Sequence, residues 1–325
     1  MNEHPAHLIN LLGLDAGWAL DLFKRADVLR ATRGTAKAPR PFVGRTAALV
    51  FHKPSLRTRV SFTVGMHELG GDAIDLTAVE VSEHGRESIP DVAHVLSGMC
   101  SMVVMRTFSH SLVTTFAQHS KVPVINALTD FSHPCQILSD LYTLKRRGFD
   151  LNKMTVAWVG DGNNVLHSWL EAATMFGFTL NIAVPDGFEP DGGLYLETER
   201  RALGRINRMR DPNEAVRGAD VVYGDTWTSM GHEDEAEWRR IAFAGYQVND
   251  ALMALTAPGA VFMHCLPAHR GEEVTNEVLD GPQSIVVEQA ENRLHLQKGL
   301  MVKLMEASES PKRNLQNAVR EALAL

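Results

Sequence analysis

Residues 46–62 read TAALVFHKPSLRTRVSF, and this stretch decides the fold class. Five of its first six residues are apolar and predict a buried strand, while apolar residues at helical spacing resume at Val60. Between them stands SLRTR (55–59), which concentrates hydroxyls and cations where ordinary turns use Gly, Asn, Asp or Pro. A strand that enters a helix through such a turn predicts a βα unit whose turn suits an anion, because helix N-termini favour negative charge.

The same alternation continues along the chain and predicts parallel sheets with helices on both faces. We expect an α/β fold of two doubly wound parallel-sheet domains, joined near residues 145–152, with the active site in the cleft between them. Further strands are predicted over 72–76, 101–106, 122–126, 154–161, 179–186, 220–225, 260–266 and 283–289. Helices are predicted over 15–31, 60–71, 109–120, 134–148, 163–177, 193–210 and 292–304.

Length and composition exclude several classes of protein. The 325 residues exceed one typical core, and 45% hydrophobic with 22% charged residues suits a globular chain. A net charge of -7 argues against a general nucleic-acid binder, so any anion site must be local. The N-terminus lacks the pattern of a secretory signal, and no apolar run is long enough to span a bilayer. Three scattered cysteines (Cys100, Cys135 and Cys265) predict a reducing cytosol without disulfides or structural zinc.

Polar clusters follow the predicted strands at the point where each strand ends. Ligands of open α/β sheets bind beyond the carboxyl ends of the strands, so these clusters are expected to share one site. Taken alone, two arginines in a turn are more often a solvated face, but Arg106 and His133 at neighbouring strand ends favour a phosphate site. The six clusters are SLRTR, Arg106, the segment from His133 to Gln136, GDGNN (160–164), DTWTSMG (225–231) and HCLP (264–267).

Three of these clusters have alternative interpretations. GDGNN has Val165 where a dinucleotide-binding fingerprint needs its third glycine, so the NAD signal is weak. Its asparagines suit a zwitterionic amino acid, although a helix N-cap is an equally ordinary role. Asp225 is placed to pair with an ammonium group or to cap a turn. Cys265 is either a buried small hydrophobe or, with a free pKa of about 8.5, a proton acceptor near the chemistry.

The remaining histidines do not form the i, i+4 pairs with an intervening acid that mark a metal site. We therefore interpret them as structural or surface residues and expect no metal and no organic cofactor. They include His52, His84, His167 and His295.

Together, six motifs closely resemble those of the aspartate/ornithine carbamoyltransferase family, in the family's order from residue 51 to 301. SxRTR and HPxQ are shared across that family, whereas SMG and HCLP are typical of its ornithine branch. The motifs are FHKPSLRTRVSF, FSHPCQILSDLYTL, VGDGNNVLHSWL, DTWTSMG, HCLPAHRG and EQAENRLHLQKGLM.

The resemblance implies a carbamoyl-phosphate-binding domain over 1–148, an ornithine-binding domain over 149–294 and a C-terminal helix, 295–325, that packs on the first domain. It implies catalytic roles for Cys265, Arg106, His133 and Arg57. The implied carbamoyl-phosphate contacts are Ser55, Leu56, Arg57, Thr58, Arg106, His133, Gln136, Cys265, Leu266 and Arg293. The implied ornithine contacts are Asn164, Asp225, Ser229 and Met230.

The resemblance also implies transfer of a carbamoyl group to the side-chain amine of L-ornithine, by a homotrimer or an assembly of trimers with each site at a subunit boundary. The alternatives are a carbamoyltransferase for putrescine or an N-acylated ornithine, and a non-catalytic amino-acid-binding regulatory protein. An NAD-dependent oxidoreductase is opposed by Val165. No nucleic-acid or membrane partner is implied.

Two features depart from the family pattern. Many relatives have STRTR where this chain has SLRTR, so position 56 keeps its backbone amide but loses a hydroxyl. The segment 80–88, EVSEHGRES, also lacks the glutamine that many relatives extend into the neighbouring subunit's phosphate site. Either His84, Arg86 or another group takes that place, or the contact from the neighbouring subunit is weaker.

Overall fold

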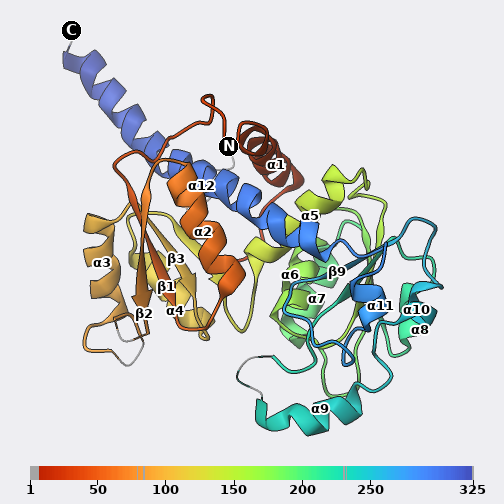
Figure 1. The fold of residues 1–325 in the computed structure, drawn as a ribbon. Coiled ribbons are helices and arrows are strands. Elements are labelled where there is room, and N and C mark those ends of the chain that lie inside the picture. Colours follow the sequence, from red (N-terminus) through yellow and green to blue (C-terminus); the bar gives the residue numbers. More distant parts are fainter. Residues whose placement is uncertain (1–6, 79, 83–84, 230, 232, 324–325) are drawn as a thin grey trace. The chain divides into compact units, whose positions relative to one another are not determined.

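The computed structural model describes residues 7–78, 80–82, 85–229, 231 and 233–323. The chain divides into two compact units (Figure 1). The first unit comprises residues 1–10, 17–135 and 293–325, and the second comprises 11–16 and 136–292. Each unit is built around its own parallel sheet, as expected from the sequence. The prediction of two parallel-sheet α/β domains is confirmed.

The first unit has a four-stranded sheet in the order β2-β1-β3-β4, and every strand pair is parallel. Side chains of β1 are buried on both faces of this sheet, because helices cover both. Ala48 and Val50 pack with residues of α3 and α4 in one apolar cluster. The elements are α1 (Ala16–Ala31), β1 (Thr46–Phe51), α2 (Leu56–Glu68), β2 (Asp72–Thr77), α3 (Ile89–Met99), β3 (Met102–Arg106), α4 (His110–His119) and β4 (Val124–Leu128).

The second unit has a five-stranded parallel sheet in the order β7-β6-β5-β8-β9. Trp158 of β5 stacks on Tyr223 of β8, with their ring centroids 5.4 Å apart. The elements are β5 (Thr155–Val159), α6 (Asn164–Ala172), β6 (Thr179–Ala183), α7 (Gly192–Arg201), β7 (Arg205–Met209), α8 (Pro212–Val216), β8 (Val221–Gly224), the 3-10 helix η1 (Glu233–Glu235), α9 (Ala236–Ala242), α10 (Asp250–Met253), β9 (Val261–His264) and α11 (Asn276–Leu279).

Two long helices carry the chain from one unit to the other. Helix α5 (Pro134–Arg146) belongs to the first unit up to Cys135 and then to the second. Helix α12 (Val286–Leu323) belongs to the second unit up to Asn292 and then to the first. Within the described residues, no helix combines the length and the hydropathy that a membrane span requires.

Two predicted elements were wrong. The stretch 193–210 is not one helix, because its last part forms the edge strand β7, whose charged residues hide the strand pattern. The stretch 283–289 is not a strand beyond a single bridge between Ser284 and Phe262, because α12 begins at Val286. Val286 is 6% exposed and Val287 is 77% exposed. Buried positions then recur at helical spacing, at Gln289, Asn292, Arg293 and Leu296.

Candidate active site

The strand order gives each sheet one topological switch point. In the first sheet, β1 has β2 on one side and β3 on the other, and in the second sheet β5 lies between β6 and β8. The crevice at such a point, outside the carboxyl ends of the strands, is where open α/β sheets bind ligands. In the first unit, Phe51 pairs with Arg106 at this end. In the second unit, Val159 pairs with Gly224. Arg106 is itself one of the six polar clusters, and SLRTR, GDGNN and DTWTSMG come soon after the other three residues.

At the first switch point, the turn after β1 leads into the N-terminus of α2. Ser55 is the N-cap residue, with extended backbone (φ -159°, ψ 108°), and within the described part of the chain its side chain makes no capping hydrogen bond. The first turn of α2 therefore presents backbone N–H groups and a hydroxyl to an incoming anion. Leu56 is 74% exposed, so its contribution to this turn is its amide and not its side chain.

Two buried arginines converge on Thr58, in the first turn of α2. Thr58 Oγ1 accepts hydrogen bonds from Arg293 Nη2 at 2.8 Å and from Arg106 Nη1 at 3.4 Å. Thr58 is fully buried, and the two arginines are 3% and 7% exposed, respectively. Two positive charges held out of water beside one neutral hydroxyl suit an anionic ligand, and guanidinium forks bind phosphate well.

His133 lies in the same arginine cluster, directly before α5. Burial lowers the pKa of His133 well below its usual value, and the charges of Arg293, Arg106 and Arg57 lower it further. The imidazole is therefore neutral near pH 7. A neutral imidazole still offers one N–H to an oxygen of a ligand, without adding another positive charge to the cluster.

The two arginines of the SLRTR motif do not act as one group. Arg59 is exposed, its Nε lies 3.6 Å from Asp75 Oδ1, and its guanidinium lies 5.1 Å from the centroid of the Phe51 ring. Arg57 is half-buried and acts electrostatically on His133. The tertiary structure thus distinguishes two arginines that the sequence presents as equivalent.

Lys53 is a buried residue of this region that the sequence pattern alone does not indicate. It is 4% exposed, forms an ion pair with Asp130, and its ammonium lies 4.1 Å from the centroid of the Phe108 ring. The pair ties the end of β1 to the loop that precedes His133. The only indication in the sequence of a role for Lys53 is its position directly before PSLRTR, and a lysine in a turn is normally solvated.

At the second switch point, Asn163 joins the loops after β5 and β8. Its Oδ1 caps α6 by accepting from the backbone N–H groups of Val165 (2.9 Å) and Leu166 (3.2 Å). Its Nδ2 donates to Asp225 Oδ2 at 2.8 Å. Asn164 begins α6 and is half-buried. The N-cap role considered for this motif is thus real, and the same residue also orients the carboxylate of Asp225.

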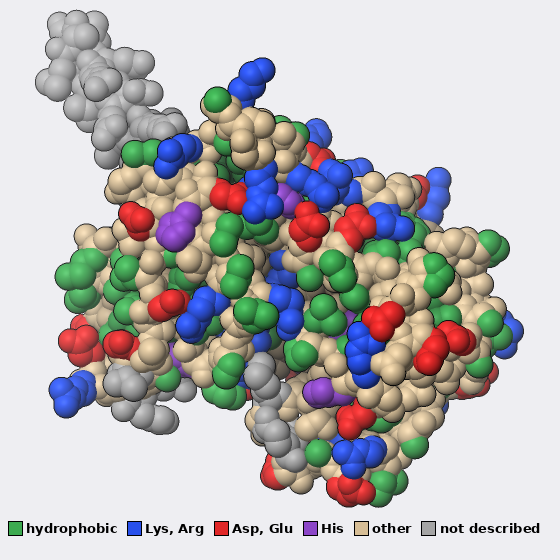
Figure 2. All heavy atoms as spheres, viewed as in Figure 1, with side chains coloured by type: hydrophobic (Ala, Val, Ile, Leu, Met, Phe, Trp, Pro, Cys, Tyr) green, Lys and Arg blue, Asp and Glu red, His purple; other side chains and the backbone are tan. Residues whose placement is uncertain are grey.

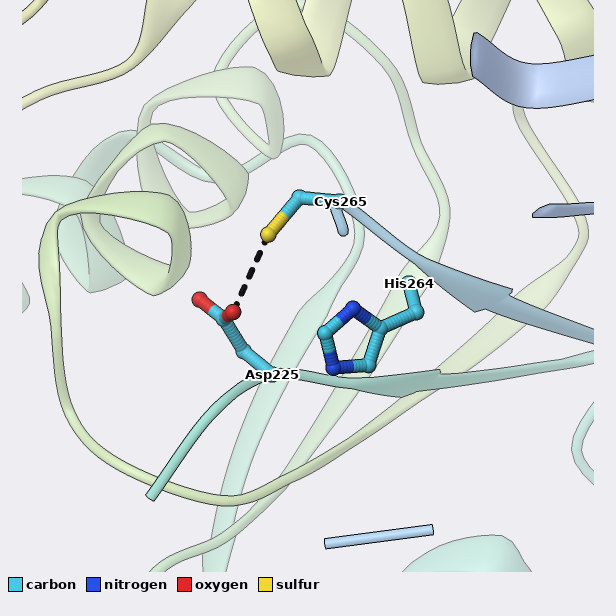
Figure 3. A group of neighbouring side chains, drawn as sticks. All are labelled: Asp225, His264 and Cys265. Carbon is cyan, nitrogen blue, oxygen red and sulfur yellow. Dashed lines mark hydrogen bonds between the residues drawn. The ribbon is translucent and has the colours of Figure 1, made fainter. Parts of the chain in front are cut away.

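The carboxylate of Asp225 also holds the thiol of Cys265 (Figure 3). Cys265 Sγ donates to Asp225 Oδ1 at 3.0 Å. His264 precedes it at the end of β9, accepts from the backbone N–H of Leu266 at Nδ1 (2.9 Å), and places Nε2 3.3 Å from Glu273 Oε1. Leu266 has φ 59° and is followed by a cis peptide bond to Pro267. An acid, a thiol and an irregular backbone therefore meet at the carboxyl ends of β8 and β9.

Two groups of side chains in the described part of the chain bring potential metal ligands within 4.8 Å of one another. The first is Asp225, His264 and Cys265, and the second is His269, Glu272 and Glu273. In the first group Asp225 and Cys265 already share a hydrogen bond, and Nδ1 of His264 accepts from the backbone. The observed geometry of Asp225 and Cys265 is that of a hydrogen-bonded acid and thiol.

The remaining predicted site residues lie in the second unit. Gln136 is 1% exposed and donates to Asp140 at 3.0 Å. Ser229 is half-buried in the segment after β8, and Met230 lies outside the described residues. On the face shown in Figure 2, acidic and basic side chains are interspersed over both units, which agrees with anion sites that are local.

Comparison with known proteins identifies both units. Residues 6–146 match the family model "Aspartate/ornithine carbamoyltransferase, carbamoyl-P binding domain", and residues 152–304 match the model of its "Asp/Orn binding domain". The chain is 47% identical over 300 residues to ornithine carbamoyltransferase of Chlorobaculum tepidum, covering 91% of this chain and 89% of the other. The chain belongs to the aspartate/ornithine carbamoyltransferase family.

Other members of the family are similar over nearly their whole length. Ornithine carbamoyltransferase of Nitrosococcus oceani is 48% identical, with 92% of this chain and 97% of the other covered. The solved structure of ornithine carbamoyltransferase from Pyrococcus furiosus has a TM-score of 0.87 at 42% identity, covering 91% of this chain and 95% of that one. The Thermus thermophilus enzyme has a TM-score of 0.84 at 42% identity, covering 93% and 99%. The family resemblance of the six motifs is confirmed.

Proposed function

We propose that this protein is an ornithine carbamoyltransferase, which transfers the carbamoyl group of carbamoyl phosphate to the side-chain amine of L-ornithine and releases citrulline and phosphate. The observation that carries the proposal is the pair of switch-point clusters. The one in the carbamoyl-P binding domain is cationic, and the one in the Asp/Orn binding domain joins an acid, an amide and a thiol.

In the first cluster, the amides of Ser55 and Leu56 and the side chains of Arg57 and Thr58 would bind the phosphate. Arg106, His133 and Arg293 would bind the oxygens around the carbamoyl carbon, where negative charge develops during attack. Gln136 and the backbone around Cys265 and Leu266 would bind the carbamoyl group itself. Losing one donor to such an oxyanion typically costs about 10²–10³ in rate.

In the second cluster, Asn164, Ser229 and Met230 would bind the amino-acid end of ornithine, and Asp225 would face its side-chain amine. That amine has an intrinsic pKa of about 10.4, so it must lose a proton before its lone pair attacks. The hydrogen-bonded pair of Asp225 and Cys265 supports a role in aiming the amine and accepting that proton. As the C–N bond forms, the C–O bond to phosphate breaks, and phosphate leaves with the electron pair. Holding both substrates together removes much of the entropic barrier.

The proposed domains correspond to these two clusters of site residues. We propose residues 1–148 as the carbamoyl-phosphate-binding domain, with helix 295–325 packed on it, and residues 149–294 as the ornithine-binding domain. We further propose a homotrimer, or an assembly of trimers, that acts in arginine metabolism in the cytoplasm. Cys100, Cys135 and Cys265 form no disulfide, which supports a reducing compartment.

A citrulline assay tests the proposal. Carbamoyl phosphate is supplied with ornithine, N-acetylornithine, putrescine or aspartate in separate reactions. We expect turnover with ornithine, whereas turnover with another amine alone would overturn the substrate assignment. Absence of citrulline with every amine would favour a non-catalytic binding protein.

The phosphate loop provides a matched pair of variants. We expect Arg57→Ala to lower kcat/KM for carbamoyl phosphate by about 10²–10³, because a charge-assisted contact to the substrate is lost. Arg59→Ala is the control, since Arg59 is exposed and faces Asp75, and its kcat/KM is expected to stay within about threefold of wild type. Near-normal activity of Arg57→Ala, with the fold intact by circular dichroism, would contradict the assignment of this loop.

A further inference from the structure

A buried polar network surrounds Asp140, one helical turn after Gln136 on α5. Asp140 is fully buried, and its Oδ1 accepts from Gln136 Nε2 at 3.0 Å. The same oxygen accepts from Gln289 Nε2 at 2.9 Å, and Oδ2 accepts from the hydroxyl of Tyr223 at 2.7 Å. Gln289 in turn accepts from the backbone N–H of His264 at 3.0 Å. Helices α5 and α12 and strands β8 and β9 are thereby joined through one carboxylate.

The donors around Asp140 fix it as an acceptor. Two amide N–H groups and one phenol hydroxyl are directed at its oxygens. Burial raises the pKa of Tyr223 well above its usual value, and the charge of Asp140 raises it further, so the phenol keeps its proton. A carboxylate that receives three donors is stabilised in its ionised form although it is buried.

This arrangement decides which end of the Gln136 amide is free. An amide side chain has a donor end and an acceptor end, and Asp140 takes the donor end. Gln136 Oε1 must then point elsewhere, and it is buried without a hydrogen-bond partner among the residues that the structure describes. A buried carbonyl oxygen that lacks a donor is unfavourable, so a ligand that brings an N–H to this oxygen gains affinity.

We propose that Asp140 is a positioning residue that holds the Gln136 amide with its oxygen toward the ligand, and thereby selects an acyl phosphate with an N–H group over one without it. The inference rests on the proposed function, in which Gln136 contacts the carbamoyl group. Carbamoyl phosphate carries an NH₂ group where acetyl phosphate carries a methyl group, and the two share the same phosphate. The comparison of these two compounds therefore isolates the contact to Gln136.

The decisive variant is Asp140→Asn. The new amide offers an N–H to Gln136 Oε1, which turns the Gln136 amide and directs its own N–H groups at the ligand. We expect the KM for carbamoyl phosphate to rise about tenfold. The hydrogen bond from the carbamoyl N–H to the Gln136 oxygen is lost, and the N–H of the turned Gln136 amide faces the N–H of the ligand instead. The inhibition constant of acetyl phosphate, measured by competition against carbamoyl phosphate, is expected to change by no more than about twofold.

A second substitution restores the acceptor. In the double variant Gln136→Glu with Asp140→Asn, the asparagine donates to one carboxylate oxygen and the other oxygen faces the ligand. We expect the ratio of the acetyl phosphate inhibition constant to the carbamoyl phosphate KM to return to within about threefold of wild type. Gln136→Glu alone sets two carboxylates side by side and is expected to lower that ratio.

Tyr223→Phe is the matched control. It removes a donor from Asp140 but leaves the contact between Asp140 and Gln136, so the ratio is expected to stay at the wild-type value even if the protein is less stable. Both constants are independent of the amount of folded enzyme. An unchanged ratio in Asp140→Asn, or an equal change in Tyr223→Phe, would overturn the inference. Absence of citrulline formation by the wild-type protein would instead contradict the proposed function.

Discussion

Residues of one type have different roles in this protein because their surroundings differ. Arg57 and Arg59 are two positions apart, yet the first adds charge beside His133 and the second is exposed beside Asp75. Among the histidines, His167 accepts from the backbone N–H of Asp191 at 3.0 Å, which is a structural role, as the sequence predicts. His84 lies outside the described residues. His295, also expected to be structural, is 2% exposed on α12.

The burial of His295 predicts that the folded protein loses stability in acid. Burial lowers the pKa of His295 to about 4, and the charges of Lys298, Arg30 and Arg33 contribute. Below about pH 6.5 the unfolded chain takes up a proton there, whereas the folded protein does so only near pH 4. The contribution of neutral His295 to the free energy of unfolding is therefore complete above pH 6.5. As the pH falls to 4, the free energy of unfolding decreases by at most about 3 kcal/mol through this group.

Urea denaturation of the wild type and of His295→Gln, followed between pH 7.5 and pH 4.5, checks this expectation. The wild type should lose more stability than the variant across that range, whatever the variant's stability at pH 7.5. Parallel pH profiles for the two proteins would show that another group is responsible.

At the scale of elements, α9 ties together the two loops that carry the proposed ornithine contacts. Arg239 is 7% exposed and donates from Nη1 to Asp161 Oδ2 (2.8 Å) and to the carbonyl of Trp227 (3.0 Å), and from Nε to Glu235 (2.9 Å). Asp161 belongs to the loop after β5, and Trp227 follows β8. Burial raises the pKa of Asp161 to about 6, and the charge of Arg239 opposes that rise.

We expect Arg239→Lys to raise the KM for ornithine about tenfold and to leave the KM for carbamoyl phosphate within about twofold. A lysine keeps the charge but cannot make the three directed bonds of the guanidinium fork. Arg240→Lys is the control, because Arg240 is exposed and pairs with Glu237 on the surface. Steady-state kinetics with each substrate varied in turn separates the two constants. An equal rise in both would indicate general loss of structure instead of positioning of the ornithine loops.

At the scale of the whole molecule, each unit has its own sheet, its own apolar core and its own switch point. The three cysteines differ in burial. Cys100 and Cys135 are buried, and Cys265 is half-buried beside Asp225. Burial raises the pKa of Cys100, and it raises the pKa of Cys135 to about 12.

Titration with a chromogenic disulfide reagent is therefore expected to modify one thiol of the native protein rapidly and all three in denaturant. Cys265→Ser should abolish the rapid phase, and carbamoyl phosphate with ornithine should slow it in the wild type. Two or more rapid thiols in the native protein would contradict the burial of Cys100 and Cys135.

The sequence by itself determined the alternation of strands and helices, the polar motifs at the strand ends and the family. Local patterns are enough for these features, since the periodicity of apolar residues reports burial and the motifs are contiguous. It failed for β7 and for residues 283–289. In the first case, charged residues on an edge strand hide the pattern. In the second, β-branched residues favour a strand, whereas the buried positions of α12 require a helix.

The tertiary structure decided which strands are neighbours and which polar atoms meet. The orders β2-β1-β3-β4 and β7-β6-β5-β8-β9 place the polar clusters at the carboxyl ends of β1, β3, β5 and β8 at the two switch points. The contact of Arg293 with Thr58 spans 235 residues, and that of Gln289 with Asp140 spans 149. Such pairings depend on how helices and sheets pack, because hydrogen bonds between distant residues leave no periodic trace in the sequence. For the same reason, the motif HPCQ does not show that the Gln136 amide donates its N–H to Asp140.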